Sequence, residues 1–343
     1  MSLSLAISKA DPSELPSRRD EDWRWTDLRG LIREVPAPAR PGHVWGPGLF
    51  EHVPADSRSE IVNGQEAKPV TLMVDGETHQ ARFVTDGAGS STSRLQVAVV
   101  GENCVLLETY ENAEGGALAF VQLEIEIAPE ASLERIVICE SAADAVLVSQ
   151  ARVTLGAGAS FKQTVLTSGA RRQRLETRVE HPGQGASARL DGLYVNALQA
   201  HSDITTVVTH EGVGGETSQL IKGVVTDQAR GVFQGRIVVS PGADKTDARM
   251  GHHALILSER AEVDAKPELE IYADDVACAH GNTVGALDED ALFYARQRGI
   301  PEPEARALLT EAFLGEVIDR IEHEGAREVC SAWLAERLRG GEA

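Results

Sequence analysis

The chain has 343 residues, of which 42% are hydrophobic and 25% charged, the composition of a globular protein with a core to bury. Its 53 acidic and 33 basic residues give a formal net charge of −20, which repels phosphate backbones and anionic membrane surfaces. We therefore expect neither a nucleic-acid nor a membrane partner. No apolar run approaches the roughly 20 residues of a membrane span and the start lacks a secretory pattern, so a cytoplasmic location is expected.

The first 90 residues are predicted to form a helical and irregular region. Up to about residue 36, apolar side chains recur on one helical face, at Trp25, Leu28, Leu31, Ile32 and Val35. Several prolines then end the helical pattern. The following stretch is rich in Pro, Gly and polar residues, with short strand-like pieces such as 70–74.

Residues 91–286 have the pattern of short strands. Apolar and polar side chains alternate at 123–127, 152–155 and 268–272, which is typical of half-buried strands. No stretch with a helical period interrupts these strands. A parallel sheet built from alternating strands and helices is therefore not expected.

Turns of small residues recur along this region. Those at Ala131, Ala159 and Ala186 are 28 and 27 residues apart, and later ones follow at shorter intervals. Repetition at about one coil predicts a β-solenoid, in which each coil covers the apolar face of the preceding one. A β-sandwich would also contain many short strands, so the pattern favours the solenoid and leaves the sandwich open.

Residues 287–343 regain a helical period and are predicted to form a C-terminal helical domain. Asp288 can cap a helix that ends near Arg298, and Pro303 suits the first turn of a second helix. A third helical segment is expected over 326–338.

The sharpest candidate for chemistry is the pair Cys278 and His280. Thiolate and imidazole suit iron or zinc, and residues two apart on a strand point the same way. Two ligands do not complete a tetrahedral site, so distant residues or a partner must supply the others. Taken alone, the pattern favours the simpler interpretation of a buried cysteine beside a solvent-facing histidine.

Other candidates have simpler interpretations. Asp274 and Asp275 are expected to cap a turn, because adjacent strand residues face opposite sides. The same geometry makes His252 and His253 a poor metal pair, and core or surface histidines are expected there. The remaining cysteines have no Cys-x-x-Cys spacing that would indicate a disulfide framework or zinc site, and a core position is expected for Cys104, Cys139 and Cys330.

The chain lacks the sequence patterns of several enzyme classes. It has no Gly-x-x-x-x-Gly-Lys-Ser/Thr loop, so it is not expected to hydrolyse ATP by itself. It also has no Gly-x-Ser-x-Gly nucleophile elbow and no His-Glu-x-x-His zinc motif.

Several motifs resemble the SufB/SufD family of iron–sulfur cluster assembly scaffold proteins. Residues 266–276 (KPELEIYADDV), followed by Cys-Ala-His-Gly at 278–281 and by 292–300 (LFYARQRGI), are similar to the family's C-terminal signature. Residues 18–28 (RRDEDWRWTDL) are similar to its N-terminal motif, and 233–237 (FQGRI) fits the strand that leads into the last coils. The Cys-x-His-Gly sequence at 278–281 resembles that of the SufD branch of the family.

The resemblance implies a right-handed parallel β-helix flanked by N-terminal and C-terminal helical regions. It implies a scaffold subunit without an active site of its own, which pairs with SufB through the β-helix and can pair with itself. The ABC-type ATPase SufC would drive the complex and dock on the C-terminal helices, where Phe313 and Leu314 are candidate contacts; ordinary helix packing is an equal alternative for both.

For the site, the resemblance implies that Cys278 and His280 help hold a nascent iron–sulfur cluster shared with SufB. The cluster would be transient, and no tightly bound cofactor is expected in the isolated chain. The alternative function is a β-helix carbohydrate-active enzyme of the lyase or epimerase type. Such an enzyme needs carboxylates and a base arrayed on one solenoid face, and the sequence shows no such cluster.

Overall fold

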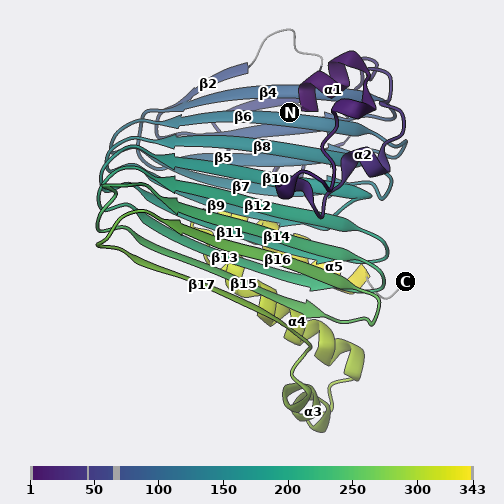
Figure 1. The fold of residues 1–343 in the computed structure, drawn as a ribbon. Coiled ribbons are helices and arrows are strands. Elements are labelled where there is room, and N and C mark those ends of the chain that lie inside the picture. Colours follow the sequence, from purple (N-terminus) through teal and green to yellow (C-terminus); the bar gives the residue numbers. More distant parts are fainter. Residues whose placement is uncertain (1–2, 45, 65–69, 341–343) are drawn as a thin grey trace.

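The protein is a parallel β-helix with helices at both ends (Figure 1). Its computed structural model describes residues 3–44, 46–64 and 70–340. Odd-numbered strands form a nine-stranded sheet and even-numbered strands an eight-stranded sheet, and every pairing is parallel between strands two apart in the chain. Each coil thus contributes one strand to each sheet. The predicted β-helix is confirmed, and the sandwich alternative is wrong.

The strands have the following bounds. The odd-numbered sheet contains β1 (Ser57–Val62), β3 (Thr78–Thr85), β5 (Cys104–Asn112), β7 (Ser132–Ser141), β9 (Ser160–Thr167), β11 (Ser187–Asn196), β13 (Glu216–Val225), β15 (Asp247–Ile256) and β17 (Ala277–Gly285). The even-numbered sheet contains β2 (Val70–Val74), β4 (Ser90–Val99), β6 (Leu118–Ile127), β8 (Val146–Leu155), β10 (Arg172–His181), β12 (His201–His210), β14 (Arg230–Val239) and β16 (Glu262–Ile271).

The small-residue turns of the sequence mark the entries into strands. Ala131, Ala159 and Ala186 are buried and directly precede β7, β9 and β11. A small side chain is required there because successive coils stack closely at the corner. Alternation then directs every second side chain inward, where the aromatic residues Phe161, Tyr194 and Phe233 fill the core. Burying one such side chain stabilises the fold by roughly 1.5–3 kcal/mol.

A charged cluster lies in the interior of the β-helix among these apolar residues. Arg135 donates to Glu108 through Nε at 2.7 Å and to Gln163 Oε1 through Nη1 at 2.6 Å. The Tyr110 hydroxyl donates to the same carboxylate at 2.8 Å. Because an unpaired buried charge costs several kcal/mol, the cluster requires all of these partners and so fixes the stacking of β5, β7 and β9.

The N-terminal segment contains short helical turns rather than the helix predicted up to residue 36. Its elements are α1 (Leu3–Lys9), η1 (Pro12–Glu14), η2 (Glu21–Trp23) and α2 (Leu28–Leu31). The helical character predicted for the N-terminus is confirmed, but the helices are short because polar groups of the segment bind the solenoid. The Trp25 carbonyl accepts from His201 Nε2 at 3.0 Å, and the Thr26 hydroxyl donates to Asp203 at 2.5 Å.

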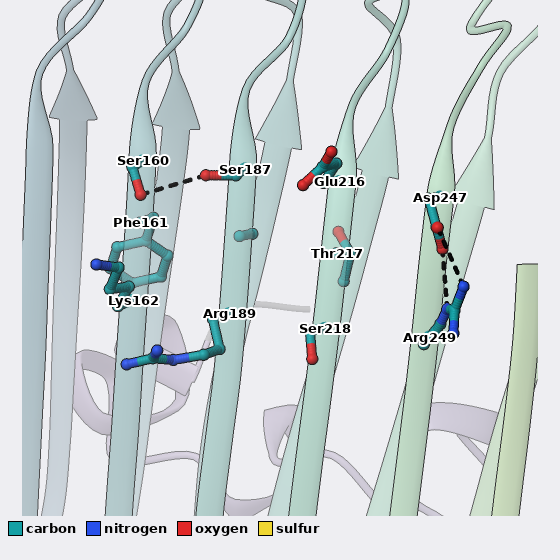
Figure 2. A pocket seen from close by; sticks show the side chains of 11 residues that line it. Ser160, Phe161, Lys162, Ser187, Arg189, Glu216, Thr217, Ser218, Asp247 and Arg249 are labelled. Atoms are coloured by element: carbon teal, nitrogen blue, oxygen red, sulfur yellow. Dashed lines mark hydrogen bonds and ion pairs between the residues drawn. The ribbon is translucent and has the colours of Figure 1, made fainter. Parts of the chain in front are cut away.

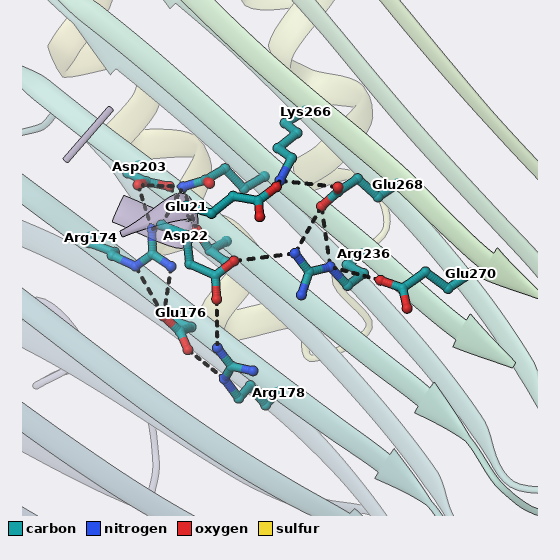
Figure 3. A network of polar contacts seen from close by, with 12 residues as sticks. Glu21, Asp22, Arg174, Glu176, Arg178, Asp203, Arg236, Lys266, Glu268 and Glu270 are labelled. Carbon is teal, nitrogen blue, oxygen red and sulfur yellow. Dashed lines mark hydrogen bonds and ion pairs between the residues drawn. The ribbon is translucent and has the colours of Figure 1, made fainter. Parts of the chain in front are cut away.

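An ionic network attaches this segment to the outer face of the even-numbered sheet (Figure 3). The buried Arg174 donates to Asp203 and Glu176 at 2.8 Å each and to the Asp22 carbonyl at 2.7 Å. Its guanidinium also lies 4.5 Å from the centre of the Trp23 ring. Farther along the network, Lys266 pairs with Glu21. The N-terminal motif is therefore anchored on β10, β12 and β16.

Three C-terminal helices follow the last coil. α3 (Glu289–Gln297) is capped by Asp288, α4 (Glu302–Ile318) begins after Pro301, and α5 (Glu324–Gly340) packs beside α4. The predicted helices are confirmed. α4 and α5 cover the outer face of the odd-numbered sheet with an apolar cluster that includes Leu314, Ile318, Trp333 and Leu334. Figure 1 shows α3 projecting beyond the last coil.

The strands begin at Ser57, within the range 1–90 that the sequence assigned to a helical and irregular region. Short strands separated by Pro, Gly and polar residues carry too little alternation to be recognised there. The division into 1–90, 91–286 and 287–343 stays a prediction. Among the described residues, no helix is long and apolar enough to cross a bilayer.

Because several histidines are buried, we expect the folded protein to lose stability in mild acid. The ring of His181 lies against that of His210 with centroids 4.3 Å apart, and burial lowers their pKa values to about 3 and about 4. Below the unfolded pKa of 6.5 the unfolded chain binds more protons than the folded chain, so folding stability falls as pH drops from about 6.5 towards 4. Each pKa unit is worth about 1.4 kcal/mol.

Urea unfolding at pH 7 and pH 5 checks this expectation in the wild type and in His181→Leu. The variant lacks one of the rings, so its free energy of unfolding should fall less between the two pH values. An equal fall in both proteins would show that this histidine is not held neutral by the fold.

Candidate functional site

The last coil of the β-helix is uncovered. β16 and β17 are the terminal strands of their sheets, so each has an edge with unpaired backbone groups. Side chains that further coils would bury are therefore exposed, and Ile271, Tyr272 and Val284 are between 42% and 61% exposed. Both the edges and the apolar side chains make this end of the solenoid a surface that another chain can cover.

Cys278 and His280 lie on the inward-facing side of β17. In the parallel register Cys278 pairs with Ala248 and His280 with Met250, and both of those residues belong to the buried core. Cys278 packs partly against that core, whereas His280 is exposed because no further coil covers it. The structure thus places the thiol and the imidazole on one side of a strand, on residues whose Cα atoms are about 6.6 Å apart in ordinary strand geometry.

The two side chains form half of a metal site. Partial burial raises the pKa of the Cys278 thiol, so the thiol is protonated at neutral pH until a metal or a base displaces the proton. Within the described ranges, no three His, Cys, Asp or Glu side chains are arranged to hold a metal ion. Further ligands for an iron ion or a cluster would have to come from another molecule that covers the last coil, formed by β16 and β17 and called the open coil below.

A chain of hydrogen bonds that runs from the buried core to the exposed Asn282 supports β17, and the sequence did not predict it. The Tyr194 hydroxyl donates to His252 Nε2 at 3.0 Å, and His252 Nδ1 donates to Asn282 Oδ1 at 2.7 Å. The His252 ring also stacks on Phe233 with centroids 5.0 Å apart. Asn282 lies two residues beyond His280 on the same side of β17, so this chain fixes the strand that carries the candidate ligands.

The other sequence candidates lie where simple packing or turn geometry places them. His252 is buried, and His253 points outward to the Thr283 hydroxyl at 2.6 Å, so they form no common site. Asp274 and Asp275 lie in the bend between β16 and β17. The core positions expected for the remaining cysteines are confirmed: the buried residues are Cys104, Cys139 and Cys330.

Phe313 and Leu314 both contact the solenoid. Leu314 is fully buried against the odd-numbered sheet, and the Phe313 ring lies 4.5 Å from Lys222 Nζ while its carbonyl accepts from the same amine at 2.8 Å. Exposed apolar side chains on these helices are instead Phe293, Tyr294 and Leu308, which are 62%, 60% and 47% exposed.

A pocket of about 320 Å³ lies on the outer face of β9, β11, β13 and β15 (Figure 2). Hydroxyl and charged side chains from four successive coils line it as parallel columns. Its cations already have partners, since Arg249 pairs with Asp247 while Lys162 and Arg189 pair with Glu322. This internal pairing leaves little unbalanced charge for a ligand.

Residues 83–313 match the family model described as SUF system FeS cluster assembly, SufBD core domain. The chain belongs to the SufBD family. This range contains both the open coil and its Cys278–His280 pair. Family membership gives no support to the carbohydrate-active alternative.

The chain is similar to proteins named iron–sulfur cluster assembly protein SufD. It is 37% identical to that of Escherichia coli (strain K12) over 182 residues, which are 53% of this chain and 43% of the relative. It is 34% identical to that of Bacillus subtilis (strain 168) over 146 residues, which are 43% of this chain and 33% of the relative. The matches thus span less than half of these relatives, and they make this SufBD-family chain SufD-like.

A longer match is to an iron–sulfur cluster assembly SufBD family protein of Mycobacterium tuberculosis (strain ATCC 25618 / H37Rv). It is 28% identical over 369 aligned positions, which cover 97% of this chain and 92% of the relative. The similarity therefore includes the N-terminal segment and the C-terminal helices as well as the solenoid.

Replacing His252 by Phe tests the support of β17. The substitution keeps a planar ring against Phe233 but removes both hydrogen bonds and leaves the Tyr194 hydroxyl buried without its acceptor. We expect a loss of about 1–3 kcal/mol in the free energy of unfolding and faster hydrogen exchange of the β17 amides.

His253→Phe on the same strand, β15, is the matched control. The His253 ring points outward and makes a single hydrogen bond, to the Thr283 hydroxyl. The substitution should change stability by less than about 0.5 kcal/mol. Equal exchange of β17 in wild type and His252→Phe would contradict the supporting role.

Proposed function

We propose that this chain is a SufD-like scaffold subunit that helps hold a nascent iron–sulfur cluster at the open end of its β-helix. The observation that carries the proposal is the position of Cys278 and His280, which point to the same side of an uncovered terminal strand. The cluster is the cargo of the assembly process rather than a resident cofactor. The proposed location is the cytoplasm.

The chemistry of the pair suits a transient cargo. Thiolate sulfur and imidazole nitrogen are both ligands of iron in proteins. The raised pKa of the Cys278 thiol means that iron must displace a proton to bind there, which weakens binding in the isolated chain. A partner that completes the ligand set and excludes water would strengthen it. His280 is the principal ligand of the proposal, and Cys278 the supporting one.

The partner for the open end is a second β-helix of the same family, SufB by resemblance or a second copy of this chain. Unpaired strand edges at β16 and β17 can add strands of another chain, and exposed Tyr272 and Val284 supply apolar contact beside them. A cluster bound there would lie between two chains. This arrangement explains why the ligand set within one chain is incomplete.

The C-terminal helices are the proposed docking surface for an ATPase of the SufC type. Phe313 and Leu314 are the contacts that the sequence suggested, but the burial of Leu314 restricts it to holding α4 on the solenoid in this structure. Exposed Phe293, Tyr294 and Leu308 offer apolar side chains on α3 and α4 for the same contact. ATP hydrolysis would belong to the partner.

Anaerobic loading with iron and sulfide tests the cluster site. The chain is first co-purified with candidate SufB and SufC partners, and cluster formation is then followed by visible absorption. In His280→Ala the complex should still assemble, because the side chain is exposed, while the cluster yield should fall about tenfold, the scale of loss known for disturbed metal sites. Cys278→Ala should lower the yield less.

His253→Ala serves as the control, since this histidine lies on the opposite side of the neighbouring strand. Normal loading in His280→Ala would remove that residue from the mechanism. A wild-type chain that binds neither partner would contradict the scaffold proposal itself.

A further inference from the structure

Three arginines converge on a pocket between the N-terminal segment and β10. The pocket has a volume of about 530 Å³, within the usual range for small-molecule sites. Its lining consists of Arg18, Asp27, Gly30, Leu31, Arg33 and Arg172. Three cations against one carboxylate is an unusual local excess in a chain whose net charge is −20.

Within the described residues Arg172 makes no ion pair, in contrast to its neighbour on the same face. Arg174, two residues along β10, pairs with both Asp203 and Glu176. Arg172 instead lies between Val146 of β8 and β12, and its Nε is buried without a hydrogen-bond partner. In the described part of the chain, no carboxylate lies within ion-pair distance of Arg172, Arg18 or Arg33.

The surroundings of Arg172 keep its charge unbalanced. Burial and the positive charges of Arg230 and Arg171 lower the pKa of Arg172, and the attraction of Asp27 offsets this only in part. Asp27 is also engaged elsewhere, since its Oδ1 accepts from the Gly30 amide at 2.7 Å. A buried guanidinium donor without an acceptor costs free energy that an anionic ligand would recover.

We propose that this pocket binds the phosphate group of a small molecule. The planar fork of arginine matches phosphate oxygens with paired hydrogen bonds, and three such groups can surround a di- or triphosphate charge. The overall negative field opposes a polyanion such as nucleic acid but admits a small anion into a local pocket. The paired cations of the pocket in Figure 2 offer no comparable charge.

A phosphate bound in this pocket would also contact both the N-terminal segment and the solenoid. Arg18 and Arg33 belong to the N-terminal segment, whereas Arg172 belongs to the solenoid. A bound phosphate therefore tightens the docking of the segment on β10. The site is separate from the Cys278–His280 coil, so its test does not depend on cluster loading.

Isothermal titration and thermal unfolding of the full chain with sodium pyrophosphate, at constant ionic strength set by chloride, test the site. Pyrophosphate should bind and raise the melting temperature of the wild type. Arg172→Gln should weaken binding by about tenfold to a hundredfold, the value of one or two charged hydrogen bonds. Without ligand, the same variant should melt at an equal or higher temperature, because it loses a guanidinium whose Nε is buried without a hydrogen-bond partner.

Arg18→Gln and Arg33→Gln, whose side chains are exposed, test the pocket without risk to folding. The matched control is Arg152→Gln, an exposed arginine on the same face of the neighbouring strand β8 and outside the pocket. Titrations with inorganic phosphate and with ADP distinguish a site for free phosphate from a site for a nucleotide. Binding of either compound supports the phosphate site. Equal pyrophosphate binding in wild type and the Arg18, Arg33 and Arg172 triple variant, or no binding to the wild type, would overturn it.

Discussion

Each coil of this β-helix depends on the next coil to cover it. Inward-facing side chains are buried between neighbouring strands of the two sheets, and backbone groups of each inner strand pair with strands on both sides. The last coil has a neighbour on one side only. Its strands consequently expose apolar side chains, unpaired backbone groups and the Cys278–His280 pair. The candidate site is thus a direct consequence of how the solenoid ends.

The same stacking explains what lies behind the site. The hydrogen-bonded chain from Tyr194 through His252 to Asn282 links β11, β15 and β17 of one sheet, spanning β13, and ends on the strand that carries His280. Polar groups in a solenoid core are costly unless fully paired, and this chain resembles the Glu108–Arg135–Gln163 cluster in that respect. Buried polar groups therefore hold neighbouring coils in one register, and the ligands gain a fixed strand.

The sequence predicted the elements whose signals are local. Asp288 caps α3 as expected, and the small residues Ala131 and Ala159 mark the coil corners. Features that depend on register could not be predicted, because the spacing between paired residues varies from 22 between Ser57 and His79 to 32 between Arg230 and Glu262. An error of one residue reverses the direction of every side chain. The contact between His252 and Asn282 could therefore not be predicted from the sequence.

The short elements of the N-terminal segment were not predicted from the sequence, for a related reason. Its apolar spacing fits a helix, but the backbone carbonyls of Asp22 and Trp25 accept hydrogen bonds from Arg174 and His201, which are 152 and 176 residues away in the chain. Such long-range partners override local propensity and have no local signature. The pocket around Arg172 arises from the same docking, so it too could be found only in the folded structure.

X-ray absorption at the iron edge of the loaded complex tests the central claim most directly, because it reports the ligands of the iron itself. If the open coil supplies a ligand, the wild-type spectrum should contain a light-atom scatterer with the multiple scattering of an imidazole ring. That signal should diminish in His280→Ala and persist in His253→Ala. Identical iron spectra in wild type and His280→Ala would contradict the claim that this end of the β-helix holds the cluster.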